Sequence, residues 1–314
     1  MFFIIFFASI TVLILSANYL VRSTEKLSSS LRISPLVIGA TGIAVGTSLP
    51  ELSVTVSSMT QGATTLGIGN IIGSNISNIL LILGLGILLF PIRVGTTKTQ
   101  RNNLISLIFS LFFITSFFSP IAYKKIFFLA SIIGYILFVI TELVWGEIGG
   151  TKEDKKNLSK LQKSRENPFL TLIKMIIAIL TLLASSKYTV SSSMEIATFF
   201  KLEGETIGLT LVAFGTSLPE TVSCVASGLK KDWKLMMGDI QGSNIFNLGV
   251  LGSSILYFSK DISVGENILP LISLFISTAL ITVLTKRFEG KTIPRYFGLV
   301  FLGLYSSYLF IILL

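Results

Sequence analysis

Histidine is absent from the 314 residues, and there is a single cysteine, Cys224. One cysteine cannot form an intrachain disulfide. The lack of histidine removes the usual proton-relay side chain near neutral pH and the usual nitrogen ligand of zinc and copper. Any metal ion that this chain handles must therefore be bound by oxygen, which favours hard cations such as sodium and calcium.

Charge is also scarce, because only 13% of the residues are charged, 51% are hydrophobic and the mean hydropathy is +0.81. A soluble domain needs more charge than this. Apolar runs such as 104–118, 126–144 and 268–284 approach the ~20 residues with which a helix crosses a bilayer. No stretch has the composition of a separate soluble domain, so the sequence predicts an all-α integral membrane protein.

Ten apolar segments predict ten transmembrane helices. The first of them lacks the basic start of a signal peptide, and Arg22 follows it instead, so it is interpreted as a span. The predicted spans are 1–21, 35–59, 65–91, 103–119, 125–145, 168–186, 206–229, 235–258, 266–285 and 294–314.

Lysine and arginine are divided unevenly between alternate connections, with nineteen on one side, five on the other and Lys174 inside a span. By the positive-inside rule this division predicts a multi-pass cell-membrane protein with both termini outside and a cytoplasmic 146–167 connection. The net charge of +9 lies in these short connections, which argues against nucleic-acid binding. The 146–167 connection is very polar and is predicted to be a solvated linker.

The chain contains an internal repeat. Residues 39–78 align with 208–247 without a gap, at a constant offset of 169 and with 19 identities in 40 positions. The identities include Pro, Glu, Asn and Ser, which chance similarity of apolar helices does not produce. Five spans per unit is an odd number, so the units have inverted topology, as in many secondary transporters. The predicted division is a five-span repeat over 1–145, the linker over 146–167 and a second repeat over 168–314.

The motif GTSLPE occurs once in each repeat and places Glu51 and Glu220 inside predicted spans. Pro50 and Pro219 can kink their helices, and we expect them to free carbonyls around Ala44 and Thr47, and around Ala213 and Thr216 in the second repeat. A carboxylate within a membrane indicates function, although a purely structural hydrogen-bonding role is the alternative. Two such carboxylates match the charge of one divalent cation.

The second motif reads GNIIGSNISN at 69–78 and GDIQGSNIFN at 238–247. Helical spacing places Ser74 with Asn78, and Ser243 with Asn247, so each pair offers oxygens on one face. Asp239 lies one turn before Ser243. The glycines at 69, 73, 238 and 242 are interpreted as close helix-packing positions.

These paired segments resemble the alpha-repeats of the cation/calcium exchanger superfamily and, within it, the prokaryotic sodium/calcium exchangers. The resemblance covers both motifs and the ten-span layout. It implies a secondary antiporter that exchanges sodium for calcium by alternating access, with the first and sixth spans sliding against the other helices. It also implies four cation sites, with Glu51 and Glu220 as central ligands and further oxygens from Thr47, Ser48, Ser74, Thr216, Ser217, Ser243 and the carbonyls of Ala44 and Ala213.

Two departures from this family pattern concern the second repeat. Some prokaryotic exchangers carry an aspartate where this chain has Asn247. The chain has Asp239 where its first repeat has Asn70, and Gln241 where it has Ile72. Asp239 either restores the missing charge or is solvated at the cytoplasmic mouth of the eighth span, and its nearness to charged residues of the preceding connection favours the second interpretation.

The counter-ion is predicted to be sodium, because the GNxxEH-like motif of proton-coupled relatives is absent. A proton- or potassium-coupled cation/calcium antiporter is the alternative. No Walker-type motif supports a pump driven by ATP. An intramembrane aspartyl protease, suggested by Gly238-Asp239, is disfavoured because its fuller GxGD pattern has Met236 at the first position. A passive channel is the remaining alternative. We expect no enzymatic activity, no cofactor and no obligate protein partner, with membrane lipids as the surroundings.

Overall fold

The computed structural model describes residues 2–31, 33–62, 64–94, 97–148, 167–199, 216–258 and 268–313. These residues are almost entirely helical, and their only β-pairing is an isolated bridge between Arg93 and Thr292. The predicted all-α fold is confirmed. The first-repeat helices are α1 (Phe2–Leu31), α2 (Pro35–Ile38), η1 (Gly39–Ile43), α3 (Ala44–Thr47), α4 (Leu49–Gln61), α5 (Thr64–Ile76), η2 (Ser77–Leu83), α6 (Gly84–Leu89), α7 (Thr97–Phe118) and α8 (Ile121–Ile148).

The second half repeats this pattern of long helices and helices with a π-helical turn, the elements numbered η. Its helices are α10 (Pro168–Phe199), α12 (Leu218–Leu229), α13 (Trp233–Phe246), η3 (Asn247–Gly252), α14 (Ser253–Phe258), α15 (Leu269–Arg287) and α16 (Tyr296–Leu313). Residues 206–215 of the predicted seventh span and 149–166 of the predicted linker lie outside the described residues. The division of the chain into two five-span repeats and a linker stays a prediction.

Each of the ten predicted spans contains helix in its described part. Within the described residues, six helices are long and apolar enough to cross a membrane, and Pro35–Thr47 with Leu49–Thr60, a pair bent by 45°, makes a seventh when the two are counted as one span. Two predicted boundaries were too short, because α1 continues to Leu31 and α10 to Phe199. In α1 the extension carries buried Thr24 and Ser28, so packing continues the helix beyond its apolar run.

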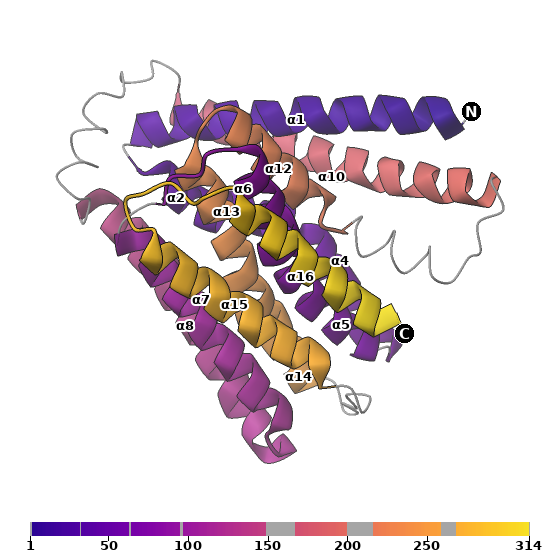
Figure 1. Cartoon of the computed structure of the whole chain (residues 1–314), viewed down its shortest axis with the longest axis vertical. Coiled ribbons are helices and arrows are strands. Elements are labelled where there is room, and N and C mark those ends of the chain that lie inside the picture. The colour runs from indigo at the N-terminus through magenta and orange to yellow at the C-terminus, as the bar shows by residue number, and fades with distance from the viewer. Residues whose placement is uncertain are drawn as a thin grey trace.

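The helices α1 and α10 form a pair that lies across the other long helices in Figure 1. The pair has an apolar cluster of its own, separate from the main core. Its members come mostly from α1 and α10 and extend to η1, α12 and α13; they are Leu13, Ala17, Leu20, Val21, Leu27, Ile38, Ile43, Met175, Ala178, Ile179, Leu182, Ala226 and Leu235. The pair is therefore packed against the rest of the molecule by a distinct layer of side chains.

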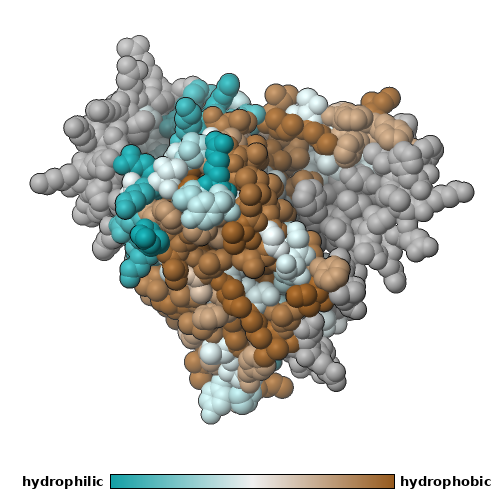
Figure 2. Space-filling model, in the orientation of Figure 1, coloured by the Kyte–Doolittle hydropathy of each residue, from teal (hydrophilic) through white to brown (hydrophobic). Residues whose placement is uncertain are grey.

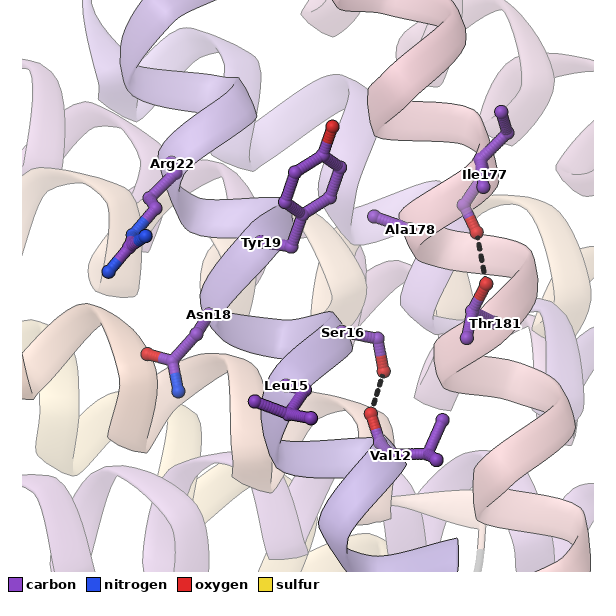
Figure 3. Close-up of a pocket in the computed structure, with 9 residues that line it drawn as sticks. All are labelled: Val12, Leu15, Ser16, Asn18, Tyr19, Arg22, Ile177, Ala178 and Thr181. Atoms are coloured by element: carbon purple, nitrogen blue, oxygen red, sulfur yellow. Dashed lines mark hydrogen bonds between the residues drawn. The ribbon is translucent and has the colours of Figure 1, made fainter.

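The outer face of this pair carries a shallow groove, which Figure 3 shows in close-up. Exposed Leu15 and Ile177 line it together with Tyr19. The hydroxyls of Ser16 and Thr181 donate to carbonyls of their own helices at 2.6 and 2.8 Å. The groove is mostly apolar, like the surface that a spanning helix presents to lipid, and its polar members besides these hydroxyls and Tyr19 are Asn18 and Arg22.

The main core is built around α5, η2, α13 and η3, with α7 and α15 packed against them. Close approach of backbones positions α13 on α2 and η1. A Cβ added at Gly238 or at Gly242 would lie 2.3 Å from the carbonyl oxygen of Leu36 or Ala40, respectively. The predicted packing role of these two glycines is confirmed. Around Gly69 and Gly73 no described atom lies within 4 Å of an added Cβ; residues 205–209, their repeat counterparts of 36–40, are not among the described residues.

Connections that the charge pattern assigns to one membrane side also meet in space. Lys230 forms an ion pair with Glu25 at 3.3 Å, which joins the end of α12 to the end of α1. The bridge between Arg93 and Thr292 joins the connection after α6 to the connection before α16, and Arg93 also donates to the Gly290 carbonyl at 3.1 Å. In Figure 2 hydrophilic residues gather at one end of the visible face, whereas the middle of that face is mostly hydrophobic.

Candidate ion-binding site

The GTSLPE motifs form the same local structure in both repeats. The helix is interrupted at Ser48 (φ −84°, ψ 11°) and at Ser217 (φ −90°, ψ 5°). A proline then occupies the first turn of the next helix, where its missing N–H costs nothing. Glu51 and Glu220 follow in that same first turn, where the helix dipole favours a negative charge. The motif thus places a carboxylate at the start of a half-helix within the membrane.

One expectation about the prolines is wrong. The Ala44 carbonyl is not freed, because it accepts the Ser48 N–H at 3.1 Å. The proline at position 50 removes an N–H that would have bonded four residues earlier, at Gly46, rather than at Ala44. The Ala44 carbonyl nevertheless accepts a second hydrogen bond from the Ser243 hydroxyl at 3.4 Å, so it lies at the contact between the two repeats. Ala213, its counterpart, lies outside the described residues.

The two glutamates are each 1% exposed and face the same buried region. Glu51 accepts a hydrogen bond from Ser74 at 3.2 Å, and Glu220 accepts one from Ser48 at 3.3 Å. The second oxygen, Oε2, of each has no hydrogen-bond partner among the described residues. A buried carboxylate oxygen without a partner is expensive. Glu51 and Glu220 also interact electrostatically with each other, so a cation between them would relieve both costs.

Asp239 belongs to this site, and the expectation that it is solvated at a cytoplasmic mouth is wrong. Its side chain is 1% exposed. One carboxylate oxygen accepts from Thr47 at 3.3 Å and the other from Ser223 at 2.6 Å. The reason is the tight contact of α13 with η1, where a Cβ added at Gly39 would lie 3.1 Å from the Asp239 amide nitrogen. This contact buries Asp239, although charged residues lie shortly before it in the sequence.

The asparagines form an amide cluster between the repeats. Asn78, 1% exposed, donates to the side-chain oxygen of Asn244 at 2.9 Å. Asn244 in turn donates to the Asn75 carbonyl at 3.4 Å. Asn247 is fully buried, and neither its nitrogen nor its oxygen has a partner among the described residues. The predicted residues Asn78 and Asn247 therefore lie inside the molecule at the second motif, as expected.

The remaining predicted hydroxyls are also buried. Thr216 is 7% exposed and Ser217 is 2% exposed. The Ser217 hydroxyl has no hydrogen-bond partner among the described residues. Thr47 is fully buried, and its single hydroxyl proton is shared between the Asp239 carboxylate and the Ile43 carbonyl, which lies 3.2 Å away. Of the thirteen predicted ligands, all but Ala213 are thus placed in buried positions in the described chain.

Sequence reasoning missed three polar residues here. Asn75 and Asn244 were visible as an identical pair in the repeat alignment, but only the fold shows that Asn244 bonds across to the first repeat. Ser223 has no such signal, because its counterpart is Val54. Its only sequence clue is its position three residues after Glu220, on the same face of a helix.

The donors of this site are carboxylate, hydroxyl, amide and carbonyl oxygens, which suit sodium and calcium. Among the described residues, no three side chains of the types His, Cys, Asp and Glu come together as a conventional metal centre. Apart from Asp239, the two glutamates are surrounded by neutral oxygens, which make a site of limited strength. Such a site is suited to an ion that must enter and leave again.

Comparison with known proteins places the chain in a family. The profile of the family described as "Sodium/calcium exchanger protein" matches residues 1–144 and 170–314. Putative antiporter CaxA of Alkalimonas amylolytica is 35% identical over 251 residues, which are 77% of this chain and 76% of CaxA. Sodium/calcium exchanger MaX1 of Methanosarcina acetivorans is 27% identical over 352 aligned positions, covering 99% of this chain and 98% of MaX1. A solved structure of the sodium-calcium exchanger NCX_Mj superposes with a TM-score of 0.81 and 28% identity, covering 96% of both chains.

Proposed function

The chain belongs to the sodium/calcium exchanger family, and we therefore propose that it is a secondary antiporter that exchanges sodium for calcium across the cell membrane by alternating access. The observation that carries the proposal is the symmetric glutamate pair. Glu51 and Glu220 are buried, occupy equivalent positions in the two repeats, and each keeps one oxygen without a partner among the described residues. A divalent cation between them balances both charges.

The remaining predicted ligands complete this site in the proposal. Ser74 and Ser48 hold one oxygen of each glutamate and thereby orient the other oxygen. The further oxygens come from Thr47, Asn78, Thr216, Ser217, Ser243, Asn247, Asp239, Ala44 and Ala213. Calcium and sodium are the cargo, and they bind alternately because they use the same carboxylates.

Alternating access is assigned to the pair of α1 and α10. The pair packs on the rest of the molecule mainly through its own apolar cluster, with the Lys230–Glu25 ion pair at one end. Helices that pack through apolar side chains slide past one another in shear motions. Movement of this pair past η1 and α12 would open the glutamate site to one side of the membrane and then to the other.

The orientation follows from the basic connections. The contacts Lys230–Glu25 and Arg93–Thr292 support a common side for four connections that the charge count assigns to the cytoplasm. We therefore place both termini outside and the 146–167 connection in the cytoplasm. Cysteine labelling from either side of intact cells, with single cysteines introduced into these connections in a Cys224→Ser background, tests this orientation.

The direct test is uptake of radioactive calcium into proteoliposomes loaded with sodium. Wild-type protein is expected to take up calcium only while an outward sodium gradient exists. Glu51→Gln and Glu220→Gln remove one charge each at nearly constant volume, and each is expected to lower uptake by about 100-fold or more, since loss of a buried charged ligand costs about 3 kcal/mol.

Matched controls keep this test specific. Glu289→Gln removes an exposed glutamate from the connection between α15 and α16, away from the site and from the contact of α1 with α12, and it should leave the uptake nearly unchanged. Uptake driven by a proton or potassium gradient without sodium would contradict the sodium coupling. Full activity of either site glutamine variant would contradict the ligand assignment.

A further inference from the structure

One carboxylate of the site has no counterpart in the other repeat. At the offset of 169 that relates the repeats, Asp239 corresponds to Asn70, and Ser223, which donates to it, corresponds to Val54. The third member of the group, Thr47, does have a counterpart, Thr216. The second repeat therefore carries a charge and a hydroxyl, on neighbouring helices, that the first repeat lacks.

These groups bring several oxygen atoms together. Ser223 and Thr47 contact different oxygens of the Asp239 carboxylate, at 2.6 and 3.3 Å. The Thr47 hydroxyl also lies 3.4 Å from the Ala44 carbonyl oxygen. The three side chains are no more than 1% exposed. A carboxylate, two hydroxyls and a carbonyl are thus brought together away from water.

A second observation points to an ion at this place. Glu220 interacts electrostatically with Asp239, and its Oε2 atom has no partner among the described residues. On the same face of α12, one turn beyond Ser223, Ser227 is fully buried and its hydroxyl also has no partner in the described chain. Two neighbouring carboxylates and an unused hydroxyl within a buried region need a cation or further polar ligands to be stable.

We propose that Asp239, Thr47 and Ser223 form a sodium-binding position beside the glutamate pair, so that Asp239 determines sodium affinity in this chain. The inference rests on the proposed function and adds which residues bind which ion. One carboxylate with neutral oxygens balances a single positive charge, whereas a divalent ion would keep an uncompensated charge in a buried place. Calcium prefers several carboxylate oxygens and therefore uses Glu51 and Glu220, which sodium shares with it, but not Asp239.

The test measures sodium and calcium dependence separately for Asp239→Asn, which restores the amide of the first repeat at nearly constant volume. In sodium-loaded proteoliposomes, the sodium concentration for half-maximal calcium uptake is expected to rise about tenfold, the equivalent of about 1.4 kcal/mol. The calcium concentration for half-maximal uptake should change less than about twofold, because the glutamate pair is intact. If Asp239 only stabilised the fold, Asp239→Asn would shift the sodium dependence and the calcium dependence alike.

Asp232→Asn is the matched control. Asp232 caps the same helix by accepting the Leu235 N–H at 3.0 Å, and asparagine caps equally well, so neither ion dependence should change. Should Asp239→Asn fold poorly, Ser223→Ala provides the second variant, with an expected rise in half-maximal sodium of roughly threefold from the loss of one hydroxyl. Thermal unfolding of detergent-solubilised protein gives a readout independent of transport, because sodium should raise the Tm of wild type more than that of Asp239→Asn, while calcium raises both alike.

The outcomes separate the two proposals. Loss of uptake in Glu51→Gln and Glu220→Gln together with an unchanged sodium dependence in folded Asp239→Asn would overturn the sodium position and leave the exchanger intact. Equal shifts for sodium and calcium in Asp239→Asn would also overturn it. Active glutamine variants at positions 51 and 220 would instead count against the proposed function itself.

Discussion

The first-repeat and second-repeat halves of the ion site share the motifs GTSLPE and GSN, but their bonds differ. Glu51 accepts its hydrogen bond from Ser74 of its own repeat, whereas Glu220 accepts its bond from Ser48 of the other repeat. Ser243, the counterpart of Ser74, donates instead to the Ala44 carbonyl. The first repeat thus supplies donors to both glutamates, and the second repeat supplies the extra carboxylate. Equal motifs therefore do not make equal ligands once the halves are packed together.

The helices that carry the GSN motifs, α5 and α13, also differ in how closely they are packed. In α13 every residue from Leu235 to Phe246 is buried, and its backbone touches α2 and η1. In α5 Gly69 is exposed and Gly73 half-buried. Among the described residues, the α13 half is therefore the more closely packed part of the site, and changes there should have the larger effect on folding.

The largest expected effect on stability is that of Gly242→Ala. The added methyl group would lie 2.3 Å from the Ala40 carbonyl oxygen, a backbone atom that cannot turn away. Overpacking of this kind costs about 3 kcal/mol, of which the better helix propensity of alanine offsets about 1 kcal/mol. We expect the apparent Tm in detergent to fall by about 5 °C.

Two further alanine variants sharpen this comparison. Gly303→Ala, on the exposed face of α16 with nothing within 4 Å, should keep or raise the Tm and serves as control. Gly73→Ala should lower the Tm less than Gly242→Ala, because no described atom lies within 4 Å of its added Cβ. An equal fall in Tm for Gly73→Ala and Gly242→Ala would mean that α5 and α13 are packed equally closely.

An intermediate effect is expected for Gln241→Ile, which introduces the first-repeat residue Ile72 at the equivalent position. Gln241 is 3% exposed and donates to the Thr99 carbonyl at 2.9 Å and to the Asn103 side chain at 2.6 Å. The substitution leaves the buried Asn103 side-chain oxygen without its donor and removes a second bond to the Thr99 carbonyl, at about 1–3 kcal/mol. The reverse change, Ile72→Gln, buries an amide without these partners. Scanning calorimetry or a thermal-shift measurement should show both variants below wild type, and an unchanged Tm for Gln241→Ile would show that the bonds to α7 add nothing.

The fold and the glutamate pair could be predicted from the sequence because they leave strong local signals. Apolar runs separated by basic connections marked the spans, and a proline next to a glutamate in each repeat marked the carboxylates. Asp239 could not be placed, since its neighbours in sequence are charged and its burial depends on the contact of α13 with η1. The role of Ser223 depends on the same contact. Sequence patterns therefore located the repeated elements and identified Asp239 as a difference between the repeats, but they did not predict its burial or its contact with Ser223.

The smallest expected effects are those of Ser48→Ala and Ser74→Ala, and they test whether the glutamates are equivalent. Each change removes one hydroxyl donor from a glutamate at nearly the same distance, 3.3 Å to Glu220 and 3.2 Å to Glu51. A lost hydrogen bond of about 0.5–1.5 kcal/mol predicts a rise of roughly 2- to 12-fold in the calcium concentration for half-maximal uptake. Because a calcium ion between the glutamates draws on both, the two variants should agree within about twofold. A clear excess for Ser48→Ala would instead show that the bond between the repeats positions Glu220 and also holds the halves together, which the bond within the first repeat does not do.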